Sequence, residues 1–184
     1  MDESGRGLWA QSGICGANCL IFCTVGNSPR GFDRMLRAVE AAAESVDDSF
    51  VYQTGYSGYT PRSGESFRFM DRDRYLGTLN TCRLMVTHGG AGTVIDARVL
   101  GKPIVIFPRR AGLGECTEDF FLELATALAG EGLAEVCEDV GSLVRAMAAD
   151  SVSASREYPA MDRRLVQALE VYLCQLLSTV NSGR

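Results

Sequence analysis

The residues best suited to chemistry surround the chain's only histidine. The segment from Thr87 to Thr93 reads THGGAGT and directly follows the apolar run 84–86. Glycine lets the backbone approach a ligand closely, and the free amides and dipole at a helix N-terminus attract anions. We therefore expect a phosphate or diphosphate site here. Its expected members are His88, Gly89, Gly90, Ala91, Gly92 and Thr93.

A second glycine loop, TVGNSPRGFD at 24–33, ends the first apolar run of the chain. It offers neutral hydrogen-bonding groups beside Gly26, on Thr24, Asn27 and Ser28. A single loop of this kind is equally well explained as a tight turn, but two loops in one domain favour a diphosphate held between them. Neither loop has the pattern of a P-loop or of a dinucleotide fingerprint.

Two side chains near the loops have competing interpretations. His88 is the last residue of its predicted strand and directly precedes the glycines, so we favour ligand contact over a purely structural role. Asp96 lies one helical turn after Thr93 and faces the same side. A carboxylate there suits the two hydroxyls of a ribose, with a solvated helix residue as an equal alternative.

The elements that must position these residues alternate regularly along the chain. Expected strands cover 19–26, 50–55, 67–70, 83–88, 103–108 and 133–138, and expected helices cover 31–45, 71–82, 92–100, 117–132 and 139–149. Thr117 and Asp139 are candidate helix N-caps. This order predicts an α/β fold with a doubly wound, mainly parallel sheet. Ligands bind such sheets at the carboxyl ends of the strands, where both glycine loops fall.

The expected domain organisation is simple. Residues 1–17 suggest a flexible leader, 18–149 the ligand-binding domain, and 150–184 a linker with a C-terminal amphipathic helix. That helix would carry an apolar stripe of Leu165, Leu169, Leu173, Leu176 and Val180, which packs on its own domain or docks on a partner.

Composition narrows the classes of function. A net charge of -5 argues against a nucleic-acid partner, and no apolar run is long enough to span a bilayer. The seven cysteines form no Cys-x-x-Cys pair, and one histidine is too few for a typical zinc site. We expect reduced, mostly buried thiols rather than disulfides, and no metal site.

Several segments together resemble the donor-binding half of family 28 glycosyltransferases over about residues 18–140. They are TVGNSPRGFDRMLRAV, VYQTGYS, LELATAL and the long segment FMDRDRYLGTLNTCRLMVTHGGAGTVIDARVLGKPIVIFPRRAGLGE. The resemblance implies half of a GT-B fold. It is strongest to the catalytic subunits of two-subunit enzymes, both the eukaryotic GlcNAc transferase that builds dolichyl-diphosphate chitobiose and bacterial exopolysaccharide transferases. The segments PRRAGLGE and QTGYSGYTPR favour the bacterial kind.

The resemblance implies a role for individual residues. Thr24, Gly26, Asn27 and Ser28 match the first diphosphate loop, and the loop from His88 to Thr93 matches the second. Phe69 and Met70 match the uracil site, while Asp96 replaces the usual ribose-binding glutamate. Members of the family carry His-Gln before LELA, where this chain has Phe120 and Phe121, which leaves its sugar preference open. The residues expected near the donor sugar or in its loop are Arg109, Arg110, Glu115, Glu118 and Asp119, with a solvated or partner-facing position as the alternative for the two arginines.

The resemblance also implies an activity. We expect an inverting glycosyltransferase subunit that uses UDP-GlcNAc or another UDP-hexose, needs no cofactor or metal, and employs His88 catalytically to stabilise the departing UDP. Its acceptor would be a sugar on a lipid diphosphate, presented by a membrane-anchored acceptor-binding subunit that supplies the base and recruits this cytoplasmic chain to the cytosolic face. The alternatives are a non-catalytic UDP-sugar-binding protein and a nucleotide-dependent enzyme of different chemistry.

Overall fold

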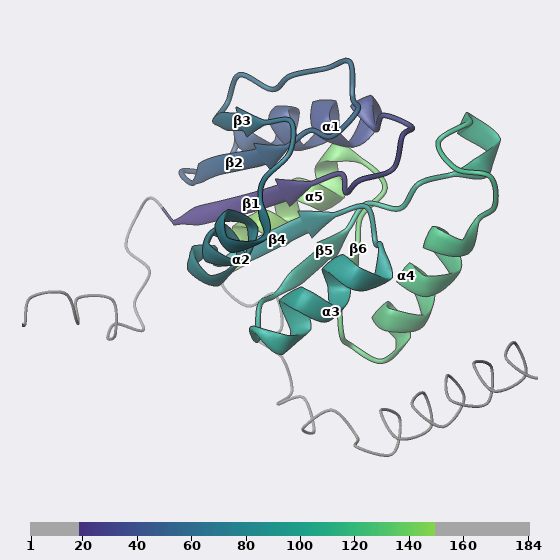
Figure 1. The fold of residues 1–184 in the computed structure, drawn as a ribbon. Helices are drawn as coiled ribbons and strands as arrows, with labels where there is room; N and C mark the ends of the chain where they lie inside the picture. Colours follow the sequence, from purple (N-terminus) through teal and green to yellow (C-terminus); the bar gives the residue numbers. More distant parts are fainter. Residues whose placement is uncertain (1–18, 150–184) are drawn as a thin grey trace, which may run out of the picture.

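A computed structural model describes residues 19–149 of this chain, shown as a coloured ribbon in Figure 1. The leader expected at 1–17 and the linker and amphipathic helix expected at 150–184 lie outside the described residues. So does the apolar stripe from Leu165 to Val180.

Strands and helices alternate throughout the described part. The strands are β1 (Leu20–Thr24), β2 (Ser49–Gln53), β3 (Glu65–Phe67), β4 (Leu84–Thr87), β5 (Ile104–Ile106) and β6 (Glu135–Val136). The helices are α1 (Asp33–Ala43), α2 (Arg72–Thr81), α3 (Ala91–Val99), α4 (Phe120–Gly130) and α5 (Val140–Ala148), with a short 3-10 turn, η1 (Ala111–Leu113). The strands form one parallel sheet in the order β3-β2-β1-β4-β5-β6, which confirms the predicted doubly wound fold.

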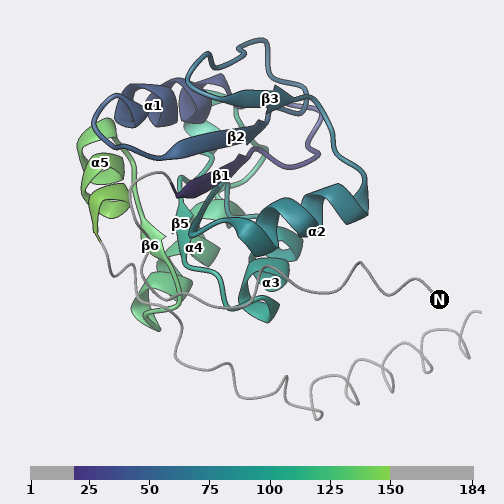
Figure 2. The same ribbon diagram turned by 90° about the vertical axis from the view of Figure 1, so that its left-hand side faces the viewer.

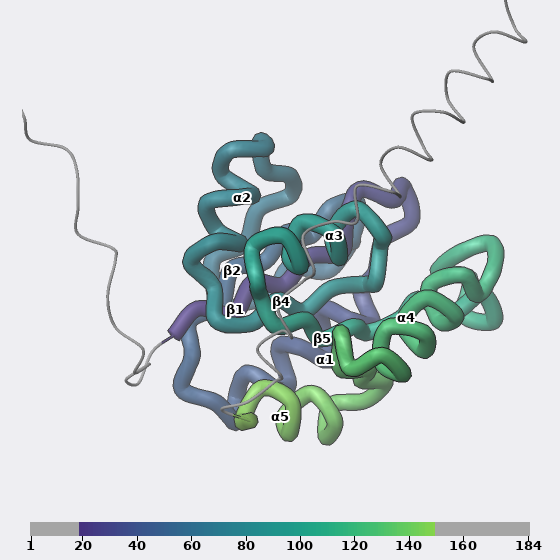
Figure 3. The backbone as a smooth tube through the Cα atoms, turned by 90° about the horizontal axis from the view of Figure 1, so that it is seen from below, coloured from purple at the N-terminus to yellow at the C-terminus, as the bar shows by residue number. Residues whose placement is uncertain are grey.

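The sheet is covered on both faces because successive strand residues point to opposite sides. Ile21 and Cys23 of β1 pack with α1 and α5, whereas Phe22 between them packs on the opposite side with residues of α2, α3 and α4. Figure 2 shows α1 and α5 on one side of the strands and α2 and α3 on the other, and the view from below in Figure 3 agrees. The central strands are therefore buried on both faces, and polar groups reach the surface at their ends.

Two predicted boundaries were wrong. The strand expected at 67–70 lies at Glu65–Phe67, because its register is set by pairing with β2, where Gln53 faces Phe67. The helix expected from Thr117 begins at Phe120 with Asp119 in the N-cap position. The Asp119 carboxylate accepts a hydrogen bond from the Ala111 amide at 2.8 Å instead of capping its own helix. A contact with η1 thus sets the start of α4, whereas the predicted cap at Asp139 is confirmed as a reciprocal capping box with Ser142.

Most of the described cysteines are free thiols. Cys23, Cys82 and Cys137 are buried free thiols and Cys116 is a half-buried one, as expected. Cys19 takes part in a disulfide, contrary to expectation for that residue. Among the described helices, none has the length and apolar character needed to cross a bilayer.

Candidate functional site

A cavity of about 460 Å³ opens where the carboxyl ends of β1 and β4 meet α2 and α3. Its size falls in the range of small-molecule sites, roughly 300–1,000 Å³. The walls come from both glycine loops, the end of β2, the start of α2 and the first turns of α3. The lining residues are Thr24, Gly26, Asn27, Gln53, Met70, Arg72, Tyr75, His88, Gly90, Ala91, Gly92, Thr93 and Asp96.

The imidazole of His88 lies between the two glycine loops, and this contact explains why both loops need glycine. A Cβ atom on Gly26 would lie 2.4 Å from the imidazole, and one on Gly90 would lie 2.5 Å from it. Both distances are far below van der Waals contact. Gly26 also has a φ of 73°, which favours glycine on its own. The glycines therefore make room for the histidine as well as for a ligand.

His88 is neutral in the free protein near pH 7. Burial lowers the pKa of its imidazole to about 4, and the nearby positive charge of Arg109 contributes in the same direction. Its Nδ1 atom lies 3.3 Å from the Thr87 hydroxyl. The imidazole also hydrogen-bonds the Thr24 backbone, which acts on the pKa in the opposite direction. A neutral imidazole has a single N–H, so donation from the second ring nitrogen to an oxyanion requires the protonation that a bound anion favours.

The N-terminus of α3 supplies further donors. Gly90 occupies the N-cap position, and no side chain caps the first turn. The amides of the first turn of a helix have no partner within the helix. Ala91, Gly92 and Thr93 of this turn line the cavity. The cavity therefore faces uncapped amides at the positive end of a helix, an arrangement suited to an anion.

Gln53 was not predicted, but it orders the first glycine loop. Its side chain is 5 % exposed, accepts a hydrogen bond from the Thr24 hydroxyl at 3.2 Å and donates to the Asn27 amide oxygen at 3.3 Å. It stands at the carboxyl end of β2, as His88 stands beyond the end of β4. A polar residue closing an apolar strand is the signal that could have identified it.

The far end of the cavity holds two more residues that sequence reasoning missed. Arg72 donates to both carboxylate oxygens of Asp96, at 2.6 and 2.7 Å. Tyr75 lies one turn further along α2 and also lines the cavity. Asp96 thus reaches the predicted side, but it already has a cationic partner. Only the packing of α2 against α3 creates this group, so the sequence carries no direct signal of it.

Three of the residues predicted to bind the nucleotide lie outside the cavity lining. Ser28 accepts a hydrogen bond from the Arg30 amide within its own loop. Phe69 is 43 % exposed and packs against Tyr56, with ring centroids 5.1 Å apart, while its neighbour Met70 does line the cavity. Gly89 has a φ of 87°, and a Cβ atom there would lie 2.9 Å from Ile106, so its contact is with the sheet.

Arg109 is fully buried and therefore neither solvated nor partner-facing. Its guanidinium donates to the carbonyl oxygens of Val25, Arg30, Gly31 and Glu115 at 3.0–3.2 Å. It also lies over the Phe32 ring, 4.5 Å from the centroid. This side chain ties the first glycine loop to the loop after β5.

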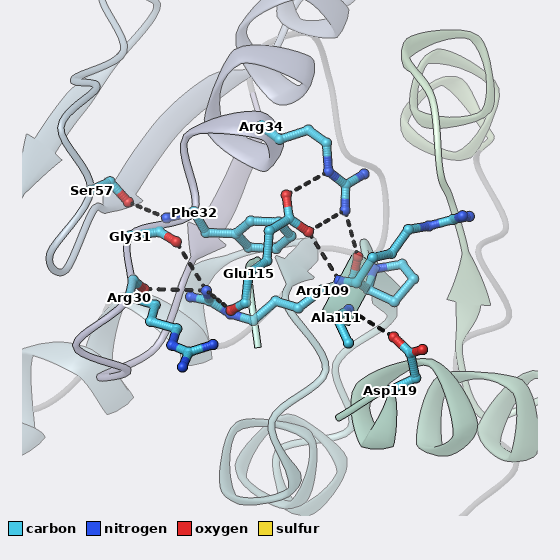
Figure 4. A network of polar contacts seen from close by, with 11 residues as sticks. Arg30, Gly31, Phe32, Arg34, Ser57, Arg109, Ala111, Glu115 and Asp119 are labelled. Atoms are coloured by element: carbon cyan, nitrogen blue, oxygen red, sulfur yellow. Dashed lines mark hydrogen bonds and ion pairs between the residues drawn. The ribbon is translucent and has the colours of Figure 1, made fainter. Parts of the chain in front are cut away.

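Three other charged residues of the loop after β5, Arg110, Glu115 and Asp119, also have protein partners. The Glu115 carboxylate binds the Arg34 guanidinium at 2.7 and 2.8 Å and accepts from the Arg110 amide (Figure 4). The Arg110 side chain pairs with Glu138 at 2.5 Å. Glu118 is exposed. A smaller open cavity of about 350 Å³ lies beside Arg110 and Asp119.

Phe121 occupies the place next to the histidine. Its ring centroid lies 5.4 Å from that of His88, whereas Phe120 is 53 % exposed and contacts Phe121. An apolar ring therefore covers one side of the imidazole.

No group of three or more His, Cys, Asp or Glu side chains able to hold a metal ion occurs within residues 19–149.

Solved structures share this fold. The calicheamicin glycosyltransferase CalG4 aligns with a TM-score of 0.61 and 22 % identity, over 85 % of this chain and 42 % of its own. The glycosyltransferase SnogD from Streptomyces nogalater aligns at 0.52 and 20 %, over 83 % and 41 % of the two chains. A putative UDP-N-acetylglucosamine 2-epimerase from Listeria monocytogenes reaches 0.50 and 16 %, over 72 % and 36 %.

These likenesses establish a GT-B-type half of a Rossmann-like fold, and this chain spans less than half the length of each protein. No curated protein matches the chain. The family model described as the glycosyltransferase family 28 C-terminal domain matches residues 20–172, which include every residue of the cavity. The chain therefore belongs to the glycosyltransferase family 28 C-terminal domain family.

Proposed function

We propose that this domain binds the diphosphate of a UDP-sugar and acts as the donor half of a glycosyltransferase. The observation that carries the proposal is the uncapped N-terminus of α3, which faces a nucleotide-sized cavity together with His88. Membership of the family supports the choice of a nucleotide sugar over other anions. The ribose and uracil would lie towards Asp96 and Met70, at the end of the cavity away from the first glycine loop.

The same geometry suits the departure of UDP. Transfer breaks the bond between the anomeric carbon and the diphosphate oxygen, and the bonding electrons stay on UDP as negative charge. Fixed donors aimed at developing charge are an effective form of catalysis because they need no reorganisation. The α3 amides and the imidazole of His88, protonated as the bound anion favours, would provide such donors, so we propose that no metal is required.

The second half of the reaction needs groups beyond this cavity. An acceptor hydroxyl attacks the anomeric carbon from the opposite side in an inverting transfer, and a base removes its proton. His88 is the only histidine of the chain and is assigned to the diphosphate. We propose that a membrane-anchored acceptor-binding subunit supplies the base, presents a lipid-diphosphate-linked sugar and recruits this chain to the cytosolic face of the membrane.

A non-catalytic UDP-sugar-binding protein is the second candidate, and Phe121 is the observation that favours it. Its ring lies against His88 where members of the family carry a polar residue for the sugar hydroxyls. Changing Phe120→His together with Phe121→Gln should raise affinity or turnover for at least one UDP-hexose if this loop faces the donor. No gain with any hexose would remove the loop from the sugar site.

The proposed binding can be tested with the full chain and a panel of ligands. UDP, UDP-GlcNAc and other UDP-hexoses should raise its melting temperature, because a ligand of the native state stabilises it, whereas NAD and ATP should have little effect. A response to none of the uridine nucleotides would contradict the proposal.

Turnover is the second measurement. Transfer from the preferred UDP-sugar to a polyprenyl-diphosphate-linked sugar should require both this chain and its candidate membrane partner. Binding without transfer under both conditions would favour the non-catalytic alternative. Strong transfer by the lone chain would contradict the need for a partner.

A further inference from the structure

The hydroxyl of Tyr75 is a buried polar group without a partner. Its Oη atom is shielded from solvent, and the described residues offer it no hydrogen bond. The ring is held in place by edge-to-face contact with Phe22, at a centroid distance of 5.6 Å. A buried hydroxyl without a partner costs roughly 1–3 kcal/mol, so a phenylalanine would serve the fold of the free chain at least as well.

The neighbours of this hydroxyl belong to the cavity. Tyr75, Thr93 and Asp96 all line it, and the Asp96 charge acts directly on the phenol. Asp96 accepts two hydrogen bonds from Arg72, but a carboxylate offers about four lone-pair positions. The carboxylate therefore keeps acceptor capacity even while it is paired with Arg72. The side chain of Arg72 is 62 % exposed, and its guanidinium lies 5.6 Å from the centre of the Tyr75 ring, so it can turn aside as a ligand enters.

A phenol donor beside a carboxylate acceptor matches two adjacent hydroxyl groups. We propose that Tyr75 is a specificity residue whose hydroxyl bonds one of the two vicinal ribose hydroxyls while Asp96 accepts from the other, so that the site selects ribonucleoside diphosphate donors over deoxyribonucleoside diphosphate donors. The inference rests on the proposed function. It states in addition that the site distinguishes nucleotides by their pentose, binding ribose in preference to deoxyribose.

The protonation state of Tyr75 agrees with this role. Burial raises the pKa of the phenol to about 12, and the negative charge of Asp96 contributes in the same direction. The side-chain interaction with Thr93 and the positive charge of Arg72 act in the opposite direction. The phenol therefore keeps its proton over the whole physiological range and can donate it to a ribose oxygen.

The test combines a side-chain change with a ligand change. Calorimetry would compare UDP, 2′-deoxy-UDP and 3′-deoxy-UDP on the wild-type chain and on Tyr75→Phe. We expect the wild type to prefer UDP, and Tyr75→Phe to weaken UDP by about three- to tenfold, the effect of one hydrogen bond. One of the two deoxy nucleotides should bind both proteins equally, because it lacks the hydroxyl that Tyr75 contacts. Tyr59→Phe is the matched control, since its hydroxyl bonds Glu40 outside the cavity, and it should leave these ratios unchanged.

The outcomes distinguish a failure of this inference from a failure of the proposed function. Equal binding of all three nucleotides by the wild type, or an equal loss for all three in Tyr75→Phe, would overturn the role of Tyr75 while the UDP site stands. Failure of the wild type to bind UDP would overturn the proposed function. The melting temperature of free Tyr75→Phe should equal or exceed that of the wild type, and a clear drop would show that the hydroxyl serves the fold instead.

Discussion

Two arginine–carboxylate groups lie near the glycine loops and are used differently. In the cavity wall, Arg72 is mostly exposed, Asp96 keeps acceptor capacity, and the nearby Tyr75 hydroxyl has no partner. In the cluster of Arg34, Arg109 and Glu115, the carboxylate and both guanidiniums bind protein groups, and Arg109 is fully buried. Residue type alone therefore does not separate a ligand-facing group from a structural one. The position of the unused hydrogen-bonding capacity does, because that of Asp96 and Tyr75 borders the cavity, whereas the unpartnered Nε atom of Arg109 lies inside the protein.

The largest effect should come from Arg109. Arg109→Met leaves four carbonyl oxygens, of which that of Val25 is buried, without their side-chain donor. The free energy of unfolding should therefore fall by about 3–5 kcal/mol, as for other broken buried networks. Urea denaturation would measure it. Arg110→Met is the control, because its exposed pair with Glu138 should contribute less than about 1 kcal/mol. Similar losses in both variants would break the distinction between the two groups.

The pH dependence of stability should reflect His88. The folded-state pKa of its imidazole is about 4, below the usual value of 6.5, so the unfolded chain binds the proton first as the pH falls. This contribution is fully present above about pH 6.5 and is lost towards pH 4, by about 3 kcal/mol in total. Denaturation of the wild type and His88→Gln across this range would isolate it. A histidine pKa near 6.5 in an NMR titration, unambiguous with a single histidine, would contradict the prediction.

A somewhat smaller effect is expected for UDP binding at the glycine loops. His88→Ala removes a hydrogen bond to a charged ligand, worth about 1.5–3 kcal/mol, so UDP affinity should fall by roughly ten- to a hundredfold in calorimetry. Gly90→Ala should act similarly, because its Cβ atom would displace the imidazole. Gly77→Ala, in open space on α2, is the control and should leave affinity unchanged. Unchanged affinity in both loop variants would remove the diphosphate from this site.

The smallest effect should come from the exposed arginine of the cavity. Arg72→Met should leave the melting temperature of the free chain unchanged, since an exposed ion pair adds little to stability. UDP affinity should change less than in His88→Ala, because Asp96 keeps its own acceptor groups. A large drop in melting temperature would show that this pair is structural, like Arg34 and Glu115. It would contradict the difference drawn between the two arginine–carboxylate groups.

Local patterns in the sequence determined most of the fold. Short apolar runs predicted the strands, and glycine with helical spacing after them placed the loop around His88 and the start of α3 correctly to within a residue. These features can be predicted from the sequence because strand burial, helix amphipathicity and glycine turns each depend on neighbouring residues. The errors at β3 and α4 arose where distant segments set the boundary, through pairing with β2 and through the Asp119 contact with η1.

Only the tertiary structure decided which polar residues are still available to a ligand. Arg109 reaches a carbonyl 84 positions away, Arg34 reaches a carboxylate 81 positions away, and Arg72 meets Asp96 across 24 residues. No local sequence pattern encodes such pairings, because the partners lie far apart along the chain and meet only in the folded structure. The sequence by itself determined where the glycine loops and the histidine stand along the chain. The packing of α2 against α3 decided that Tyr75 and Asp96 border one cavity, and the burial of the loop after β5 decided that Arg109 does not.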